Sequence, residues 1–190
     1  MRKIPTLFVR DFDRCHGRYV TREVTPGCEW VLAGEGVATR KWNGTCVLVA
    51  EDGSLWARRE VKPGKPMPGI FRPVETDETT GKTVGWEPAQ RSGFAKFIDE
   101  AAAGKVIEPG TYELVGPKIN GNPDGFAEHV LAPHGNYHLE DVYDRSFDGL
   151  LDWTGAHPGV EGIVFWRERG NPDAGMVKIK RRDFLRVGDV

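Results

Sequence analysis

Four groups of residues have types and spacings that could perform chemistry. The first is Lys41, in the run Lys41-Trp42-Asn43-Gly44 just before a β-branched segment. A lysine amine can act as a covalent nucleophile once it has lost its proton. The same tetrapeptide is also typical of a turn that enters a strand, with Asn and Gly taking positive φ angles. The tetrapeptide alone therefore leaves both interpretations open.

The other three groups follow in a fixed order along the chain. Glu113 lies in an apolar, strand-like run, and Glu161 opens the apolar run 162–166. Lys178 and Lys180 are two residues apart, so on a strand their side chains point to the same face. Each group alone can be explained as ordinary solvation of a strand end. The order of nucleophilic lysine, two acidic strands and paired lysines carries more information than any of its parts.

This ordered set resembles the covalent nucleotidyltransferase superfamily of DNA ligases, RNA ligases and mRNA capping enzymes. In that superfamily Lys-x-Asp-Gly is the first motif, an acidic strand the third, Glu-Gly-(Ile/Val)-Val the fourth and Lys-x-Lys the fifth. Three further segments resemble the small ATP-dependent 5′-to-3′ RNA ligases: 56–58 (WAR), 113–123 (ELVGPKINGNP) and 132–135 (APHG). The resemblance extends over residues 35–186, which is most of the chain.

The resemblance implies an ATP-dependent RNA ligase that joins RNA 5′-phosphate and 3′-hydroxyl ends, as in RNA repair. Lys41 would take AMP from ATP as a lysyl-AMP phosphoramidate, and pyrophosphate would leave. The AMP would then pass to an RNA 5′-phosphate, and a 3′-hydroxyl would attack the activated end. The implied cofactors and partners are ATP, Mg²⁺ (with Mn²⁺ as an alternative) and RNA.

The resemblance also assigns roles to residues distant from Lys41. Lys178 and Lys180 suit the α-phosphate, and Glu161 suits a Mg²⁺ ion that is otherwise held by waters. Glu113 corresponds to the residue that binds the ribose hydroxyls. Arg58 matches a position that contacts the nucleotide or the incoming RNA end.

Residues next to Lys41 complete the expected nucleotide-binding set. The backbone of Thr39 and Arg40 is expected to face the adenine edge, and Asn43 and Gly44 are expected to lie beside the nucleotide. Free lysine has a pKa near ~10.4, so we expect nearby cations to lower that of Lys41, with Arg40, the two strand lysines and Mg²⁺ as candidates.

Asn43 departs from the pattern of the family, which usually has Asp at this position. In the family this side chain helps to bind the ribose and to position the 3′-hydroxyl during sealing. An amide keeps an acceptor oxygen but loses the negative charge. We therefore expect Asn43 to alter the sealing step more than lysine adenylation.

The overall charge does not indicate a nucleic-acid-binding protein, because the formal net charge is −2. Any RNA contact must therefore come from local patches. Residues 58–72 and 176–186 each contain five cations and one carboxylate. These segments could grip the RNA backbone, or they could be solvated loops near a sheet edge.

The pattern of turns and apolar runs predicts an α+β domain. The 24 Gly and 13 Pro indicate many turns, and Asp52-Gly53 predicts a hairpin over 45–57. We expect mainly antiparallel sheets flanked by a few helices, as in the ligase adenylation (nucleotidyltransferase) domain. Further strands are expected at 111–116, 128–132, 137–142, 161–166 and 175–180, helices at 91–103 and 146–153 (or a turn at 183–186), an extended loop at 61–73 and a polar excursion at 74–90.

Domain organisation and cellular location are inferred from length and composition. A chain of 190 residues is expected to form a single adenylyltransferase domain over 1–190, and the ten residues after Lys180 are too few for an OB-fold domain. Three cysteines without metal-ligand spacing indicate neither a disulfide framework nor zinc. With a polar N-terminus and no apolar span, we expect a cytoplasmic monomer without membrane contact.

Two alternatives to an RNA ligase stay open from the sequence. One is another lysine nucleotidyltransferase, either a DNA ligase or a capping-type enzyme that uses GTP. The other is a non-catalytic domain that binds nucleotides or RNA with the same fold. Labelling with ATP against GTP separates a capping-type enzyme from a ligase, and a comparison of nicked DNA with 5′-phosphorylated single-stranded RNA separates a DNA ligase from an RNA ligase. AMP on the protein excludes the second alternative.

Overall fold

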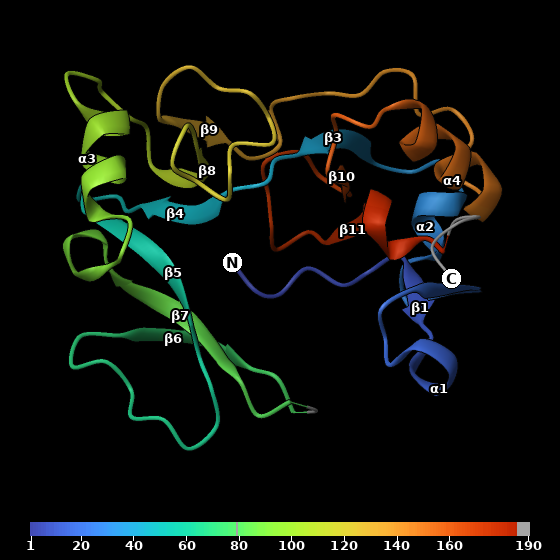
Figure 1. The fold of residues 1–190 in the computed structure, drawn as a ribbon, viewed down its shortest axis with the longest axis horizontal. Helices are drawn as coiled ribbons and strands as arrows, with labels where there is room; N and C mark the ends of the chain where they lie inside the picture. Colours follow the sequence, from blue (N-terminus) through green and yellow to red (C-terminus); the bar gives the residue numbers. More distant parts are fainter. Residues whose placement is uncertain (79, 186–190) are drawn as a thin grey trace. The chain divides into compact units, whose positions relative to one another are not determined.

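The computed structural model describes residues 1–78 and 80–185 and divides them into two compact units. The Lys41 unit contains residues 4–42 and 135–185, and the Glu113 unit contains residues 1–3 and 43–134. Each helix and strand belongs to one unit only (Figure 1). Strands outnumber helices, and every pairing between named strands is antiparallel. The structure is therefore α+β with mainly antiparallel sheets, as the sequence predicts.

The Lys41 unit contains two small sheets and short helices. One sheet pairs β1 with β2, and the other has the strand order β11-β10-β3. Its elements are β1 (Phe8–Arg10), α1 (Phe12–Cys15), β2 (Val20–Val24), α2 (Glu29–Leu32), β3 (Val37–Lys41), α4 (Phe147–Ala156), β10 (Gly162–Trp166), β11 (Met176–Lys180) and the 3₁₀ turn η2 (Arg181–Asp183).

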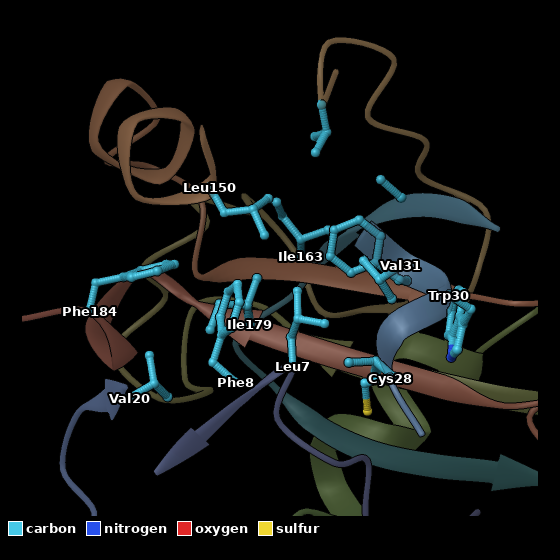
Figure 2. Packing of buried hydrophobic residues seen from close by; sticks show 14 residues of the cluster. Leu7, Phe8, Val20, Cys28, Trp30, Val31, Leu150, Ile163, Ile179 and Phe184 are labelled. Carbon is cyan, nitrogen blue, oxygen red and sulfur yellow. The ribbon is translucent and has the colours of Figure 1, made fainter. Parts of the chain in front are cut away.

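One hydrophobic core holds the Lys41 unit together. The inward face of the three-stranded sheet contributes Ile163 and Ile179, which pack with Leu150 of α4 and Phe8 of β1 (Figure 2). All four side chains are at most 1% exposed. Burying large apolar side chains is the main favourable term in folding, so this core fixes the strands that carry the charged residues.

The Glu113 unit is built on one six-stranded sheet of order β6-β7-β5-β4-β8-β9. α3 packs on β8 and β9, and Ile98 from α3 is fully buried with Val47 and Leu114 of the sheet. The elements are β4 (Thr45–Val49), β5 (Leu55–Val61), β6 (Arg72–Thr76), β7 (Thr83–Pro88), the 3₁₀ turn η1 (Ala89–Arg91), α3 (Ala95–Ala102), β8 (Gly110–Val115) and β9 (Val130–Pro133).

Several expected elements are confirmed. The hairpin around Asp52-Gly53 is β4–β5, and Gly53 has a φ of 77°, as the turn requires. The helix expected over 91–103 is α3, and the helix with Ser146 as N-cap is α4, whose cap accepts a hydrogen bond from the Gly149 amide. The strands expected at 111–116, 128–132, 161–166 and 175–180 correspond to β8, β9, β10 and β11.

The prediction of a strand over 137–142 is wrong. Only His138 forms an isolated bridge, with Thr39 of β3, and the backbone bonds on either side of it are Arg40 N–H to Tyr137 O and Leu139 N–H to Ala38 O. This segment covers the edge of β3 for three residues and then leaves the sheet. The alternation of apolar and polar residues in 137–142 is too short to maintain a continuous ladder of strand hydrogen bonds.

The segment 74–90, expected to be a polar excursion, contains the end of β6 and all of β7. Thr83, Trp86 and Glu87 of β7 are buried, and Glu87 pairs with Arg59 at 2.7 Å. Polar residues at buried positions hide the strand from a pattern of hydrophobicity. Residue 79 of this segment, and residue 186 of the turn expected at 183–186, lie outside the described residues.

In the described part of the chain, no helix has the length and apolar character needed to cross a membrane.

Candidate functional site

Strand register in the Lys41 unit brings Lys41 and Lys180 to one row of the sheet. β10 is the central strand, and its Gly162 pairs with Lys41 on β3 and with Lys180 on β11. Directly paired residues of neighbouring strands share a face. The two lysines therefore flank a glycine, which has no side chain to separate them.

The next row on the same face contains Thr39, Val164 and Lys178. Side chains two residues apart on a strand point the same way, so Lys178 lies on the same face as Lys180. The opposite face carries the buried Ile163 and Ile179. Period-two alternation therefore separates a cationic face from the core.

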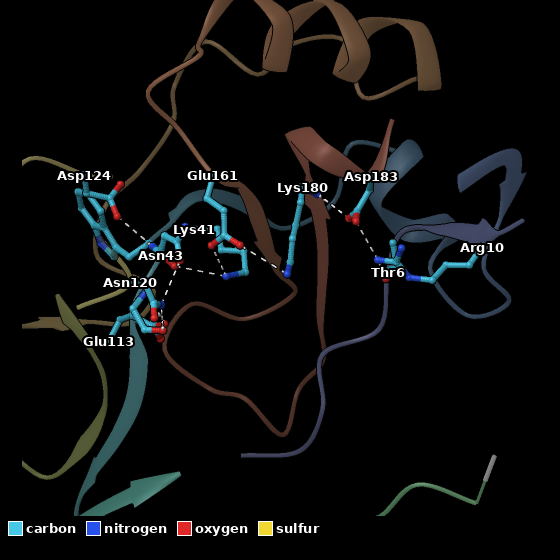
Figure 3. A network of polar contacts seen from close by, with 12 residues as sticks. Thr6, Arg10, Lys41, Asn43, Glu113, Asn120, Asp124, Glu161, Lys180 and Asp183 are labelled. Atoms are coloured by element: carbon cyan, nitrogen blue, oxygen red, sulfur yellow. Dashed lines mark hydrogen bonds and ion pairs between the residues drawn. The ribbon is translucent and has the colours of Figure 1, made fainter. Parts of the chain in front are cut away.

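Glu161 joins the two lysines of the first row. Its Oε2 lies 2.6 Å from the Lys41 Nζ, and its Oε1 lies 3.5 Å from the Lys180 Nζ (Figure 3). The three side chains are only 19%, 13% and 15% exposed for Lys41, Glu161 and Lys180. Charged groups that are this poorly exposed to solvent need a partner of opposite charge, and here one carboxylate pairs with two lysine side chains.

Burial and crowding lower the pKa of both strand lysines. The pKa of Lys178 falls to about 8, first because burial penalises its ammonium and then because Lys180 and Lys41 lie nearby. Burial is also the largest cause lowering the pKa of Lys180, while Glu161 acts in the opposite direction. This face therefore concentrates positive charge and would gain from a bound anion.

A second polar network lies in the Glu113 unit. The Oε1 of Glu113 accepts the Gly44 amide at 3.1 Å, and its Oε2 lies 2.9 Å from His134 Nε2. The other ring nitrogen of His134 lies 3.1 Å from Thr111 Oγ1. Because a carboxylate only accepts, His134 donates from Nε2. Glu113 is thus held at both oxygens.

Asn43 belongs to the same network. Its backbone N–H donates to Asp124 Oδ2 at 2.9 Å. The Nδ2 of Asn120 donates to the Asn43 side-chain oxygen at 3.2 Å and to the Gly44 carbonyl at 3.0 Å. Asn120 adopts a φ of 46° to do this, a conformation that Asn tolerates better than most residues. The loop after Lys41 is fixed mainly through its backbone.

At Gly44 and at Gly162 the backbone lies so close to a neighbouring strand that there is no room for a side chain. A Cβ added to Gly44 would lie 2.1 Å from the Leu114 carbonyl oxygen, and one added to Gly162 would lie 2.2 Å from the Ile179 carbonyl oxygen. Neither contact can be relieved by rotating a flexible side chain, since both partners are backbone. Each glycine lets a strand that carries functional side chains pack against its neighbour.

The amino-acid sequence is similar to those of several known proteins. The chain is 26% identical over 203 aligned positions to RNA ligase 1 of Rattus norvegicus and, with the same values, to RNA ligase 1 of Mus musculus. Each alignment covers 68% of this chain and 62% of the relative. RNA ligase 1 of Pongo abelii is 40% identical over 62 residues, which is 29% of this chain and 19% of that protein.

This similarity supports a relationship to RNA ligases. The chain spans about 62% of the length of the rat and mouse relatives. No protein-family model matches the sequence.

The remaining predicted residues are engaged in local contacts. Thr39 is buried, and its hydroxyl donates to Val164 O and accepts from Trp166 Nε1, both at 3.0 Å. The Arg40 guanidinium donates to Gly159 O at 2.8 Å, and its backbone amide is already bonded to Tyr137. Backbone contacts from these two residues to an adenine edge stay a prediction.

Arg58 lies on β5 of the Glu113 unit and is half-buried. Its Nη1 donates to the backbone carbonyl of Met1 at 2.6 Å. A contact between Arg58 and a nucleotide or RNA end stays a prediction.

Two sets of side chains could hold a metal ion, and their chemistry differs. Glu161 offers hard carboxylate oxygens, which suit Mg²⁺. Cys46, Glu113 and His134 have ligand atoms that all lie within 4.8 Å of one another. Thiolate and imidazole ligands suit softer ions such as Zn²⁺. Sequence spacing gave no sign of this second group, because its members come from three separate strands or turns.

Asn120 belongs to the ligase-like segment 113–123 but was given no role, and Asp124 was not singled out from the sequence; together they fix Asn43 and Gly44. The ligase-like segment 132–135 contains His134 but assigned it no partner, whereas His134 contacts the Glu113 carboxylate directly. The Asn-Gly-Asn-Pro run at 120–123 was a signal for an unusual loop. Only the tertiary structure connects that loop with residue 43, which lies 77 positions earlier.

Proposed function

We propose that this protein is an ATP-dependent RNA ligase that joins RNA 5′-phosphate and 3′-hydroxyl ends through a lysyl-AMP intermediate on Lys41. The observation that carries the proposal is the Glu161 carboxylate shared by Lys41 and Lys180 on one face of the sheet. The similarity to proteins named RNA ligase 1 supports the choice of substrate.

The first step joins the Lys41 nitrogen to the α-phosphorus of ATP. The bond from that phosphorus to the bridging oxygen of the β-phosphate breaks, and pyrophosphate leaves. Lys41 is held in an ion pair with Glu161, so its nitrogen must leave this pair and pass a proton to water before it can attack.

Lys178 and Lys180 would neutralise charge on the α-phosphate, because the protein's share in phosphoryl transfer is mostly positioning and electrostatics. The donor chemistry of Glu161 fits Mg²⁺, which commonly keeps waters and takes one or two carboxylates. When bound, Mg²⁺ would neutralise phosphate oxygens. A Mg²⁺ ion bound by Glu161 would have to share this carboxylate with Lys41.

The Glu113 unit would bind the nucleoside part. A carboxylate accepts hydrogen bonds from both ribose hydroxyls, and His134 and the Gly44 amide hold Glu113 in one orientation. Asn43 would act later, when the 3′-hydroxyl attacks the activated RNA end. The half-buried Arg58 is proposed to contact the nucleotide or the RNA end.

Mass spectrometry after incubation with ATP and Mg²⁺ tests the first step. We expect an added AMP on the peptide that contains Lys41, and none in Lys41→Arg. Lys105→Arg, a change at an exposed lysine, serves as the matched control and should be labelled like the wild type. Labelling of Lys41→Arg would show that Lys41 is not the nucleophile.

A substrate comparison tests the rest of the proposal. Parallel incubation with α-labelled GTP should give no label, since the proposed nucleotide is ATP. The adenylated protein should seal 5′-phosphorylated RNA in preference to nicked DNA. Preferential sealing of nicked DNA would instead indicate a DNA ligase.

A further inference from the structure

A cationic cavity of about 620 Å³ lies in the Lys41 unit. It is lined by residues from the segment 10–19 and from the end of β11 with η2. Five of its lining residues are cationic and one, Asp183, is acidic; the cationic ones are Arg10, Arg18, Lys180, Arg181 and Arg182.

The carboxylate of this cavity is already neutralised. Asp183 is buried, and its Oδ1 accepts from Arg10 Nη2 at 2.8 Å while its Oδ2 accepts from the Lys180 amide at 2.9 Å (Figure 3). Arg18 and Arg182 are exposed and form no ion pair with any of the residues that the structure describes. The cavity therefore has positive charge without a matching anion.

Tyr19 gives an independent sign of a missing ligand. Tyr19 is one of the lining residues and is only 8% exposed, and its buried hydroxyl has no hydrogen-bond partner within the described part of the chain. A buried hydroxyl without a partner is costly, so such groups are usually satisfied by protein, water or ligand. A phosphate oxygen in the cavity would accept this hydrogen bond once the side chains that close the hydroxyl off from solvent move aside.

An exposed aromatic ring stands beside the cavity. Phe12 is 67% exposed, and its ring lies against Gly17, a residue of the cavity lining, so closely that a Cβ there would meet it at 2.6 Å. Aromatic rings next to cations are the usual means of binding single-stranded nucleic acids, because bases stack on the ring while cations hold the backbone. This pairing favours a nucleotide at a strand end over free polyphosphate.

The cavity is connected to Lys41 through a continuous chain of contacts within the unit. Asp183 bonds the amide of Lys180, whose Nζ shares Glu161 with Lys41. We propose that this cavity binds the 5′-phosphate of an RNA strand, with the terminal base stacked on Phe12. This rests on the proposed function, in which that phosphate accepts AMP from Lys41.

Equilibrium binding of two short RNAs tests the site directly. The RNAs are identical, carry a fluorophore at the 3′ end, and have either a 5′-phosphate or a 5′-hydroxyl. The measurement uses the full chain with Lys41→Ala and no ATP, so that no lysyl-AMP forms. We expect about tenfold tighter binding of the phosphorylated RNA, since the charge-assisted bonds in the cavity need the phosphate.

Three variants locate this preference. Arg18→Gln should remove most of it, and Tyr19→Phe, which keeps the ring, should reduce it about threefold. Phe12→Ala should weaken the binding of both RNAs to the same extent. The control is Arg22→Gln on β2, which removes an exposed arginine paired with Asp148 and leaves the preference intact. Equal binding of the two RNAs, or an unchanged preference in Arg18→Gln and Tyr19→Phe, overturns the proposal.

Adenylation by ATP distinguishes the two possible sources of phosphate. With Lys41 restored, Arg18→Gln and Tyr19→Phe should form lysyl-AMP at the wild-type rate. A loss of adenylation combined with an unchanged 5′-phosphate preference would show that the cavity holds the polyphosphate of ATP, and would overturn the RNA assignment. If the wild type never becomes adenylated, the ligase proposal fails, while the RNA preference is still measured independently.

Discussion

The Lys41 unit and the Glu113 unit fix their functional residues by different means. In the Lys41 unit, side chains of opposite charge hold one another, with Glu161 between Lys41 and Lys180 of one row of a three-stranded sheet. In the Glu113 unit, side chains mostly hold backbone groups, as Glu113 holds the Gly44 amide and Asp124 that of Asn43. The first arrangement depends on charge and the second on loop geometry.

This difference matches the chemistry proposed for each unit. Phosphoryl transfer develops and moves charge, so it needs paired ions that can exchange partners. Recognition of a nucleoside needs acceptors at fixed positions, which backbone contacts provide without large changes in charge. Variants should therefore divide into those that alter the rate of adenylation and those that alter nucleotide affinity.

The largest effect should come from Glu161→Gln in the Lys41 unit. The amide leaves two ammonium groups without a shared anion and removes the proposed Mg²⁺ ligand. We expect the rate of lysyl-AMP formation, followed with labelled ATP, to fall about 100-fold. Glu168→Gln, at an exposed acid after β10, is the matched control. A wild-type rate in Glu161→Gln would remove the charge-based account of this unit.

A smaller effect of another kind is expected for Glu113→Gln. Glutamine still accepts the Gly44 amide but loses the charge that strengthens its hydrogen bonds to ribose hydroxyls. We expect the KM for ATP in adenylation to rise about tenfold with little change in kcat. An unchanged KM with a large loss of kcat would mean that the two units do not divide binding and chemistry as proposed.

The pH dependence of ATP binding should distinguish Lys178 from the Glu113 unit. With a pKa of about 8, Lys178 is a cation below that pH and neutral above it. Above pH 8, ATP binding must recruit a proton, so affinity should fall by up to about tenfold per pH unit. Lys178→Arg keeps its charge and should remove this dependence between pH 7 and 9. Equilibrium titration of ATP in the absence of turnover is the measurement.

The smallest effect is expected for Asn43→Asp. A carboxylate at this position still accepts from Asn120, so the loop should keep its geometry. We expect lysyl-AMP formation to stay within about threefold of the wild type, while sealing of pre-adenylated RNA changes more. Loss of adenylation would show that residue 43 acts in the first step.

Much of the fold could be predicted from local patterns. The hairpin around Asp52-Gly53, the helix capped by Ser146 and the strand pair β10–β11 have strong turn, cap or alternation signals. β7 was hidden because, apart from Trp86, its buried positions are polar or glycine. The N-terminal strands of three to five residues were not assigned, since runs that short resemble loops.

The sequence by itself indicated which residues could be reactive, and it placed Glu113, Lys178 and Lys180 on strands, whereas the strand that ends at Lys41, β3, was not predicted. Alternation alone placed Lys178 and Lys180 on one face, because side-chain direction on a strand is a local property. Only the tertiary structure decided that Glu161 serves both Lys41 and Lys180, that His134 holds Glu113, and that Arg10 and Asp183 meet at one cavity. Such pairings depend on strand register and on contacts between residues far apart in the chain, which no local pattern contains.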